Sequence, residues 1–145
     1  MILYLDSSAL AKRYLSEEGS AEVERLVAGA EMVATSIITR VEVSAALARA
    51  RRQKLLDAEP AARLRALFAR HWGTLLRLSL LESTVDRADS LAWELDLRGY
   101  DAIHLASTLA WREAIAESPV LATYDKELWR AAQTQGLDVW PEDLG

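Results

Sequence analysis

The sequence predicts an α/β protein of three layers, with a short parallel sheet of four to five strands flanked by helices. Short apolar runs typical of buried strands alternate with longer stretches that carry apolar residues at helical spacing. This alternation favours a parallel sheet that is covered on both faces. The 145 residues contain no linker, internal repeat or low-complexity segment, so we expect a single domain over 1–145.

The first predicted strand covers residues 2–5 and ends at Asp6. An Ala- and Leu-rich helix over 7–15 follows it. A polar run breaks that helix, and Ser20 is the expected N-cap of the next one, since serine side chains satisfy free N–H groups at helix starts. Gly29 ends this second helix.

The second strand is predicted over 32–34. Ser36 is the expected cap of a helix over about 37–53, which carries apolar residues at helical spacing and ends in a basic run. Asp57 then opens another helix that extends through about His71.

The second half of the chain predicts six further elements. In order, they are a strand over 75–80, a helix over about 82–95, a helix opened by Asp101, a strand over 119–123, a helix that starts at Asp125 and an edge strand over 137–140. The helix opened by Asp101 is apolar nearly all round, so we expect it to lie centrally in the fold.

Composition excludes several classes of protein. There are no cysteines, which rules out disulfides, thiolate zinc sites and a cysteine nucleophile. A histidine-rich metal site is not expected, because His71 and His104 are the only histidines. The net charge of -5 argues against a protein that coats nucleic acid. No apolar run approaches the roughly 18 residues of a membrane span and no signal region is evident, so we expect a cytoplasmic protein with no membrane contact.

Four carboxylates are candidates for a common site. Asp6 ends the first strand, Glu42 lies in the helix after the second, Asp101 opens the helix before the fourth, and Asp125 follows the fourth. Because parallel strands end at one shared edge, we expect Asp6, Glu42 and Asp125 near that edge. Asp101 joins them if its helix begins over the same edge.

Each of these acids also has a purely structural interpretation. The three aspartates lie near helix starts, where a carboxylate accepts backbone N–H bonds and faces the positive end of the helix dipole. Glu42 borders the apolar face of its helix, where a carboxylate needs a partner, and an ion pair with Arg40 or Arg49 would supply one.

Gathered at one edge, the carboxylates would repel one another, and a divalent cation would relieve that repulsion. An all-oxygen set of ligands suits Mg²⁺ or Mn²⁺ rather than zinc. Such ions polarise phosphoryl oxygens and activate water, so the residues predict hydrolysis of phosphodiesters.

Each of the four acids lies in a short block of sequence, and the blocks are Leu5–Lys12, Thr39–Ala46, Tyr100–Ala106 and Leu121–Leu128. In this order they resemble the conserved blocks of PIN-domain ribonucleases, in particular the VapC-type toxins of toxin–antitoxin pairs. The resemblance extends over essentially the whole chain. It implies a PIN-like fold, a Mg²⁺- or Mn²⁺-dependent endoribonuclease that cuts RNA, a homodimer and inhibition by a small cognate antitoxin.

The resemblance also assigns roles to the four acids as the catalytic and metal-binding set. It implies that Asp6 and Asp101 are metal ligands, that Glu42 binds metal or orients the attacking water, and that Asp125 acts directly or through water.

Other polar residues are candidates for supporting contacts. Ser7 and Thr123 are expected to add hydroxyl contacts in the site. Lys12, Arg13 and Arg40 are candidate contacts for RNA phosphates, and the alternative for them is a solvated helix face.

His104 has two interpretations, a general base or a packed, hydrogen-bonded helix residue, and the second is favoured because metal-bound water needs no histidine base.

Alternative functions remain open from the sequence. A phosphatase with Asp6 as nucleophile is disfavoured, since such enzymes usually carry an acid two residues later, where Ser8 stands. Two other functions stay open. One is a stand-alone RNA-processing nuclease without an antitoxin, and the other is a non-catalytic PIN-like module that binds RNA or protein. No short motif encodes the RNA target.

Overall fold

The computed structural model describes residues 1–145, which form one five-stranded parallel sheet and seven helices. In chain order the elements are β1 (Ile2–Leu5), α1 (Ser7–Ala11), α2 (Ser20–Ala28), β2 (Met32–Ser36), α3 (Thr39–Arg52), α4 (Ala58–Trp72), β3 (Leu76–Leu78), α5 (Glu82–Leu95), α6 (Gly99–Ile115), β4 (Val120–Ala122), α7 (Lys126–Thr134) and β5 (Asp138–Trp140). The strands lie in the order β3-β2-β1-β4-β5, and every neighbouring pair is parallel. The predicted fold class is confirmed.

Strand β1 is the centre of the molecule because both of its faces are apolar. Leu3, Tyr4 and Leu5 are completely buried. Side chains alternate across a strand, so Tyr4 enters the core beneath α5, α6 and α7, whereas Leu3 and Leu5 enter the core beneath α1, α3 and α4. Burial of each of these side chains stabilises the fold by about 1.5–3 kcal/mol.

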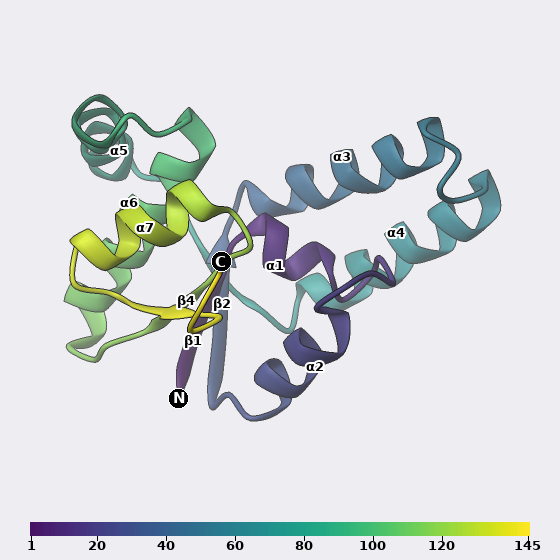
Figure 1. Ribbon diagram of the computed structural model, residues 1–145, viewed down its shortest axis with the longest axis horizontal. Helices are drawn as coiled ribbons and strands as arrows, with labels where there is room; N and C mark the ends of the chain where they lie inside the picture. The colour runs from purple at the N-terminus through teal and green to yellow at the C-terminus, as the bar shows by residue number, and fades with distance from the viewer.

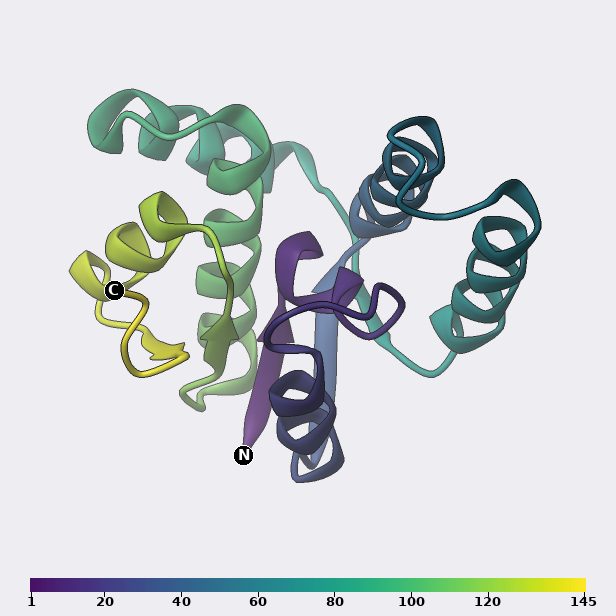
Figure 2. The same ribbon diagram turned by 45° about the vertical axis from the view of Figure 1, so that its right-hand side comes forward.

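The helices form a layer on each side of the sheet, as the strand pattern predicts. Figure 1 shows α5, α6 and α7 on one side and α1 to α4 on the other. Helices α3 and α4 pack against each other and extend away from the sheet, which both views show (Figures 1 and 2). No helix combines the length and the apolarity that a membrane crossing requires.

The strand order reverses at β1. The chain runs from β1 to β2 and β3 on one side and then crosses to β4 and β5 on the other. At such a reversal the connections leave in opposite directions, which opens a crevice at the carboxyl end of the strand. Asp6, the residue after β1, stands at this point.

Several predicted boundaries are wrong. Helix α1 ends at Ala11 rather than residue 15, because the chain turns there into the loop before α2. Gly19, not Ser20, occupies the N-cap of α2, and the Ser20 hydroxyl instead donates to the carbonyl of Leu15. A left-handed backbone at Gly19, with φ of 90°, sets this start.

Two further starts differ in the same way. Helix α3 begins at Thr39, because Ser36 still belongs to β2 and its hydroxyl accepts the N–H of Ile38 in the intervening turn. Helix α6 begins at Gly99, which places Asp101 in its first turn rather than at its cap. The third strand is shorter than predicted and covers only 76–78.

Candidate active site

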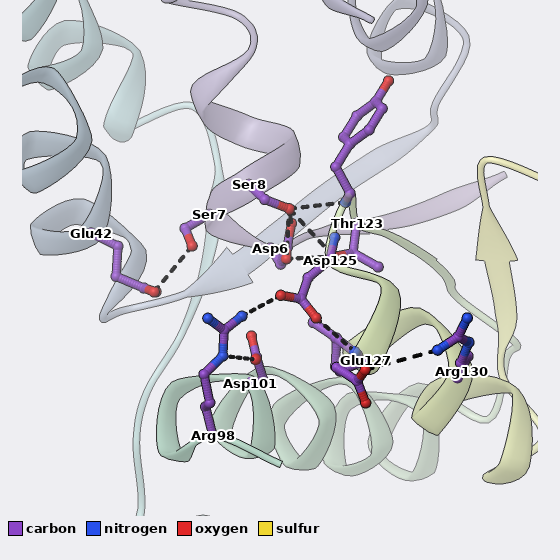
Figure 3. A network of polar contacts seen from close by, with 12 residues as sticks. Asp6, Ser7, Ser8, Glu42, Arg98, Asp101, Thr123, Asp125, Glu127 and Arg130 are labelled. Carbon is purple, nitrogen blue, oxygen red and sulfur yellow. Dashed lines mark hydrogen bonds and ion pairs between the residues drawn. The ribbon is translucent and has the colours of Figure 1, made fainter. Parts of the chain in front are cut away.

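All four predicted acids line one pocket at the carboxyl ends of β1 and β4, with a volume of about 330 Å³. Figure 3 shows how their side chains converge from several elements. The acids are Asp6, Glu42, Asp101 and Asp125, and the polar side chains that accompany them include Ser7, Ser8, Lys12 and Arg98. The start of α6 does lie over the sheet edge, so Asp101 joins the other three.

Asp6 is held by hydrogen bonds on both carboxylate oxygens. It caps α1 by accepting the N–H of Ala9 on Oδ1 at 2.9 Å. The Ser8 hydroxyl lies 2.7 Å from Oδ1 and 2.9 Å from Oδ2, and the Thr123 hydroxyl donates to Oδ2 at 2.6 Å. Asp6 is only 2% exposed, and burial raises its pKa, while these donors oppose the rise. The capping role and the pocket position therefore belong to the same side chain.

Asp101 and Asp125 share one arginine. Arg98 donates from Nε to Oδ2 of Asp101 at 3.1 Å, and its Nη2 pairs with Oδ2 of Asp125. Asp125 also caps α7 by accepting the N–H of Leu128. Burial raises the pKa of Asp101 to about 6, with a further contribution from the negative charge of Asp125, although Arg98 acts in the opposite direction.

Glu42 is separate from that cluster and has its own partners. Its Oε2 accepts a hydrogen bond from the Ser7 hydroxyl at 3.0 Å, and its Oε1 lies 2.7 Å from Nε2 of His104. The expected ion pair between Glu42 and Arg40 or Arg49 is wrong, because Glu42 instead contacts Ser7 of α1 and His104 of α6.

The packed, hydrogen-bonded interpretation of His104 is confirmed. His104 is 1% exposed, and its Nδ1 lies 2.8 Å from the hydroxyl of the fully buried Tyr4. The two rings meet edge to face.

The supporting residues fall in different places. Ser7 and Thr123 each contact a pocket carboxylate. Of the candidate phosphate contacts, only Lys12 lines the pocket, where its Nζ binds Glu17 and lies 4.2 Å from the ring centroid of Tyr124. The other two lie elsewhere, since Arg13 pairs with Glu24 and Arg40 lines a groove between α3 and α4.

Sequence reasoning missed Arg98 and Ser8. The position of Arg98 three residues before Asp101 is a usable signal, because the side chains of an N-cap residue and of the third helical residue lie close together. Ser8 was weighed only as a position that lacks an acid. A serine two residues after a capping aspartate is well placed to reach that carboxylate.

The donor set fits Mg²⁺ or Mn²⁺. It consists of carboxylates and hydroxyls without sulfur, and the negative charges of Asp125 and Asp6 add to the burial that raises the pKa of Asp101. In the described arrangement no three acidic or histidine side chains form a metal-binding group. The Asp6 oxygens face Ser8 and Thr123, and the Arg98 guanidinium pairs with Asp101 and Asp125. An ion shared by these aspartates would replace Arg98 as their counter-charge.

Comparison with known proteins gives one family. Residues 3–133 match the sequence model of the PIN domain. The chain is 32% identical over 143 residues to ribonuclease VapC45 of Mycobacterium tuberculosis, covering 99% of this chain and 97% of that protein.

Two solved structures share the fold. A toxin–antitoxin complex from Klebsiella pneumoniae matches with a TM-score of 0.62 and 20% identity, over 85% of this chain and 86% of that one. VapBC2 from Rickettsia felis, bound to a promoter DNA fragment, matches with a TM-score of 0.63 and 16% identity, over 96% and 97%.

Proposed function

Because this chain belongs to the PIN domain family, we propose that it is a metal-dependent endoribonuclease and the toxin of a type II toxin–antitoxin pair. The observation that carries the proposal is the meeting of Asp6, Glu42, Asp101 and Asp125 in one pocket. A relative that is 32% identical to this chain is named a ribonuclease, and the match covers nearly the whole of both chains.

In this proposal Asp6 and Asp101 hold Mg²⁺ or Mn²⁺, with Asp125 beside them. When bound, the ion supplies positive charge to a phosphoryl oxygen and lowers the pKa of a water. Asp6 contributes a carboxylate that Ser8 and Thr123 keep in a fixed orientation. A fixed orientation matters because reacting groups must already lie near the geometry of the transition state.

Glu42 orients the attacking water from the other side of the pocket. It is the acid whose partners, Ser7 and His104, are not shared with the aspartate cluster. The water gives up a proton to solvent as its oxygen bonds to phosphorus, the bond from phosphorus to the leaving ribose oxygen breaks, and that oxygen takes up a proton from solvent as the two RNA fragments separate. Lys12 and Arg98 are the cationic side chains at the pocket and are positioned to bind neighbouring phosphates.

The direct test is cleavage of total RNA by the purified protein with Mg²⁺, Mn²⁺ or EDTA. We expect discrete fragments that disappear with EDTA and in Asp6→Asn and Asp101→Asn. The matched control is Asp89→Asn, an exposed aspartate on α5, which should cut like the wild type. Equal cleavage by the wild type and both pocket variants would reject the assignment. RNA binding without cleavage would favour the alternative of a binding module.

A groove between α3 and α4 is the proposed site for the antitoxin. It has a volume of about 700 Å³, an apolar lining that includes Leu47 and Phe68, and basic side chains from Arg40, Arg51 and Arg65. An amphipathic helix with acidic residues beside its apolar stripe complements such a groove.

The antitoxin proposal is tested with any small protein that is encoded beside this one. Arg51→Glu combined with Arg65→Glu should weaken its binding and leave RNA cleavage unchanged, whereas Arg130→Glu on α7 should affect neither. Absence of any binding neighbour would favour the stand-alone nuclease. Family membership also leads us to propose a homodimer, which light scattering would test.

A further inference from the structure

A continuous chain of hydrogen bonds runs from the core to the pocket. The Tyr4 hydroxyl lies 2.8 Å from Nδ1 of His104, Nε2 of His104 lies 2.7 Å from Oε1 of Glu42, and the Ser7 hydroxyl donates to Oε2 of Glu42 at 3.0 Å. These residues come from β1, α6, α3 and α1. Four separate elements therefore determine where one carboxylate lies.

The hydrogen-bond chemistry gives this chain a direction. An ionised carboxylate only accepts, so Nε2 of His104 carries the hydrogen that faces Glu42. In the neutral imidazole Nδ1 is then an acceptor, and the Tyr4 hydroxyl donates to it. Tyr4 thus selects the tautomer that can bind Glu42.

The burial of these groups argues for a fixed arrangement. Tyr4 is fully buried and His104 is 1% exposed, so neither ring can turn without disturbing the core. The side chain of Glu42 is 21% exposed and reaches the pocket. Tyr4 and His104 therefore form the rigid part of the hydrogen-bond network. The Glu42 carboxylate is its exposed end, and Ser7 and His104 each hold one of the carboxylate oxygens.

The partners of Glu42 also differ in kind from those of the other acids. Asp101 and Asp125 are paired with the charged guanidinium of Arg98. Glu42 is held by the Ser7 hydroxyl and an imidazole N–H, and no arginine or lysine pairs with it. The Glu42 carboxylate is therefore held in place without a lysine or arginine that would neutralise its negative charge.

We propose that His104, with its tautomer fixed by Tyr4, is a positioning residue that aims the Glu42 carboxylate at the attacking water. The proposal rests on the proposed function and deepens it, because it explains how the acid that lies apart from the aspartates is kept in place. The role is carried by the N–H of Nε2, and the imidazole itself does not touch the substrate.

The kinetic test compares His104→Leu, His104→Gln and Tyr4→Phe on one RNA substrate. His104→Leu should lower kcat about 10- to 100-fold with KM nearly unchanged, as loss of a partner behind a functional ligand does. His104→Gln should restore part of kcat, since its amide N–H can reach toward Glu42. Tyr4→Phe should give a smaller loss, because it removes the preference for one tautomer but keeps the imidazole.

A second tyrosine–histidine pair in the protein serves as a matched control. Tyr14 and His71 form a similar pair, with the hydroxyl 3.0 Å from Nδ1, and neither residue lines the acidic pocket. Tyr14→Phe and His71→Gln should therefore leave kcat and KM unchanged. Melting temperatures of all variants, measured by circular dichroism, separate a positioning effect from simple unfolding.

A spectroscopic measurement tests the contact without any RNA. Long-range ¹H–¹⁵N spectra should assign His104 to the Nε2–H tautomer, and Glu42→Ala should increase its Nδ1–H form while the His71 signals stay fixed. His104 signals that do not respond to Glu42→Ala would overturn the contact.

Folded His104→Leu with wild-type kcat, or His104→Gln no more active than His104→Leu, would overturn the positioning role. A wild type that cuts no RNA would instead reject the proposed function, and with it the role in the reaction, while the spectra would still decide whether Glu42 and His104 are coupled.

Discussion

Arg98 and Asp101, three residues apart at the start of α6, form an ion pair of 3.1 Å inside the pocket. The same guanidinium pairs with Asp125 across the gap to α7 (Figure 3). Arg98 therefore occupies the place of a counter-ion between two carboxylates that would otherwise repel each other. A divalent cation at these aspartates has to compete with it.

Replacement of Arg98 by methionine should expose that competition. In EDTA, Arg98→Met should melt at a lower temperature than the wild type, because Asp101 and Asp125 lose their counter-charge. Mn²⁺ should restore the melting temperature and bind about twofold to fivefold more tightly by calorimetry, equivalent to at most about 1 kcal/mol for a partly exposed pair. Arg130→Gln, which removes only a 3.8 Å pair with Glu127, is the control. Weaker Mn²⁺ binding by Arg98→Met would show that the arginine assists the ion.

Asp101 should make the metal-free protein less stable as the pH rises. Its folded pKa of about 6 lies above its ordinary value of 3.8, so between these values the folded state binds the proton and the unfolded state does not. Stability is therefore highest below the lower value and falls as pH rises through about 6, by up to about 3 kcal/mol.

The pH effect is measured by urea unfolding in EDTA at pH 4.5 and 7.5. The free energy of unfolding of Asp101→Asn, relative to the wild type, should rise between these two pH values. Asp89→Asn, on the exposed face of α5, should show no such change. A variant that loses stability relative to the wild type as pH rises would contradict the assigned shift.

Ser8 joins two parts of the site through one oxygen. It donates to Asp6 and accepts the backbone N–H of Tyr124 at 2.9 Å. Ser8→Ala should cost about 1–3 kcal/mol of unfolding free energy, because it leaves that N–H without a partner. Ser83→Ala, in the exposed first turn of α5, should change stability by less than about 0.5 kcal/mol in the same urea titration. Equal results for the two serines would mean that water replaces the Ser8 hydroxyl.

Gly19 should not tolerate a side chain. Its φ of 90° is unfavourable for other residues, and an added Cβ would lie 2.8 Å from Cζ of Tyr124. Gly19→Ala should therefore destabilise the fold by at least about 2 kcal/mol in thermal or urea unfolding. Gly99→Ala is the matched control, because an added Cβ there meets nothing within 4 Å and the position is helical. If both variants unfold alike, the Tyr124 ring has moved aside.

The position of Asp6 was predictable because it depends on local pattern. Four apolar residues define β1, and the parallel arrangement then brings the ends of β1 and β4 to the same edge. The four acids follow from that geometry, since each occupies a strand end or the start of a neighbouring helix. A parallel sheet was enough to predict Asp6, Glu42 and Asp125 near one edge, whereas Asp101 joins them because α6 begins over that edge.

The partners of the acids were not predictable from local sequence. Arginines near Glu42 in sequence were the expected partners, but the observed ones, Ser7 and His104, lie 35 and 62 residues away. Arg98 meets Asp125 across 27 residues through a contact that only the packing of α6 against α7 creates. The predicted start of α2 was wrong for a related reason, because the backbone geometry at Gly19 outweighs the capping preference of Ser20.

The bond between Thr123 and Asp6 joins residues 117 positions apart, and this separation has a consequence during translation. At about 5–20 residues per second, a ribosome adds Thr123 roughly 6 to 23 s after Asp6. Throughout that interval the first strand has neither β4 beside it nor the hydroxyl that orients its carboxylate. A nascent chain therefore carries an incomplete pocket until β4 and Thr123 have been added.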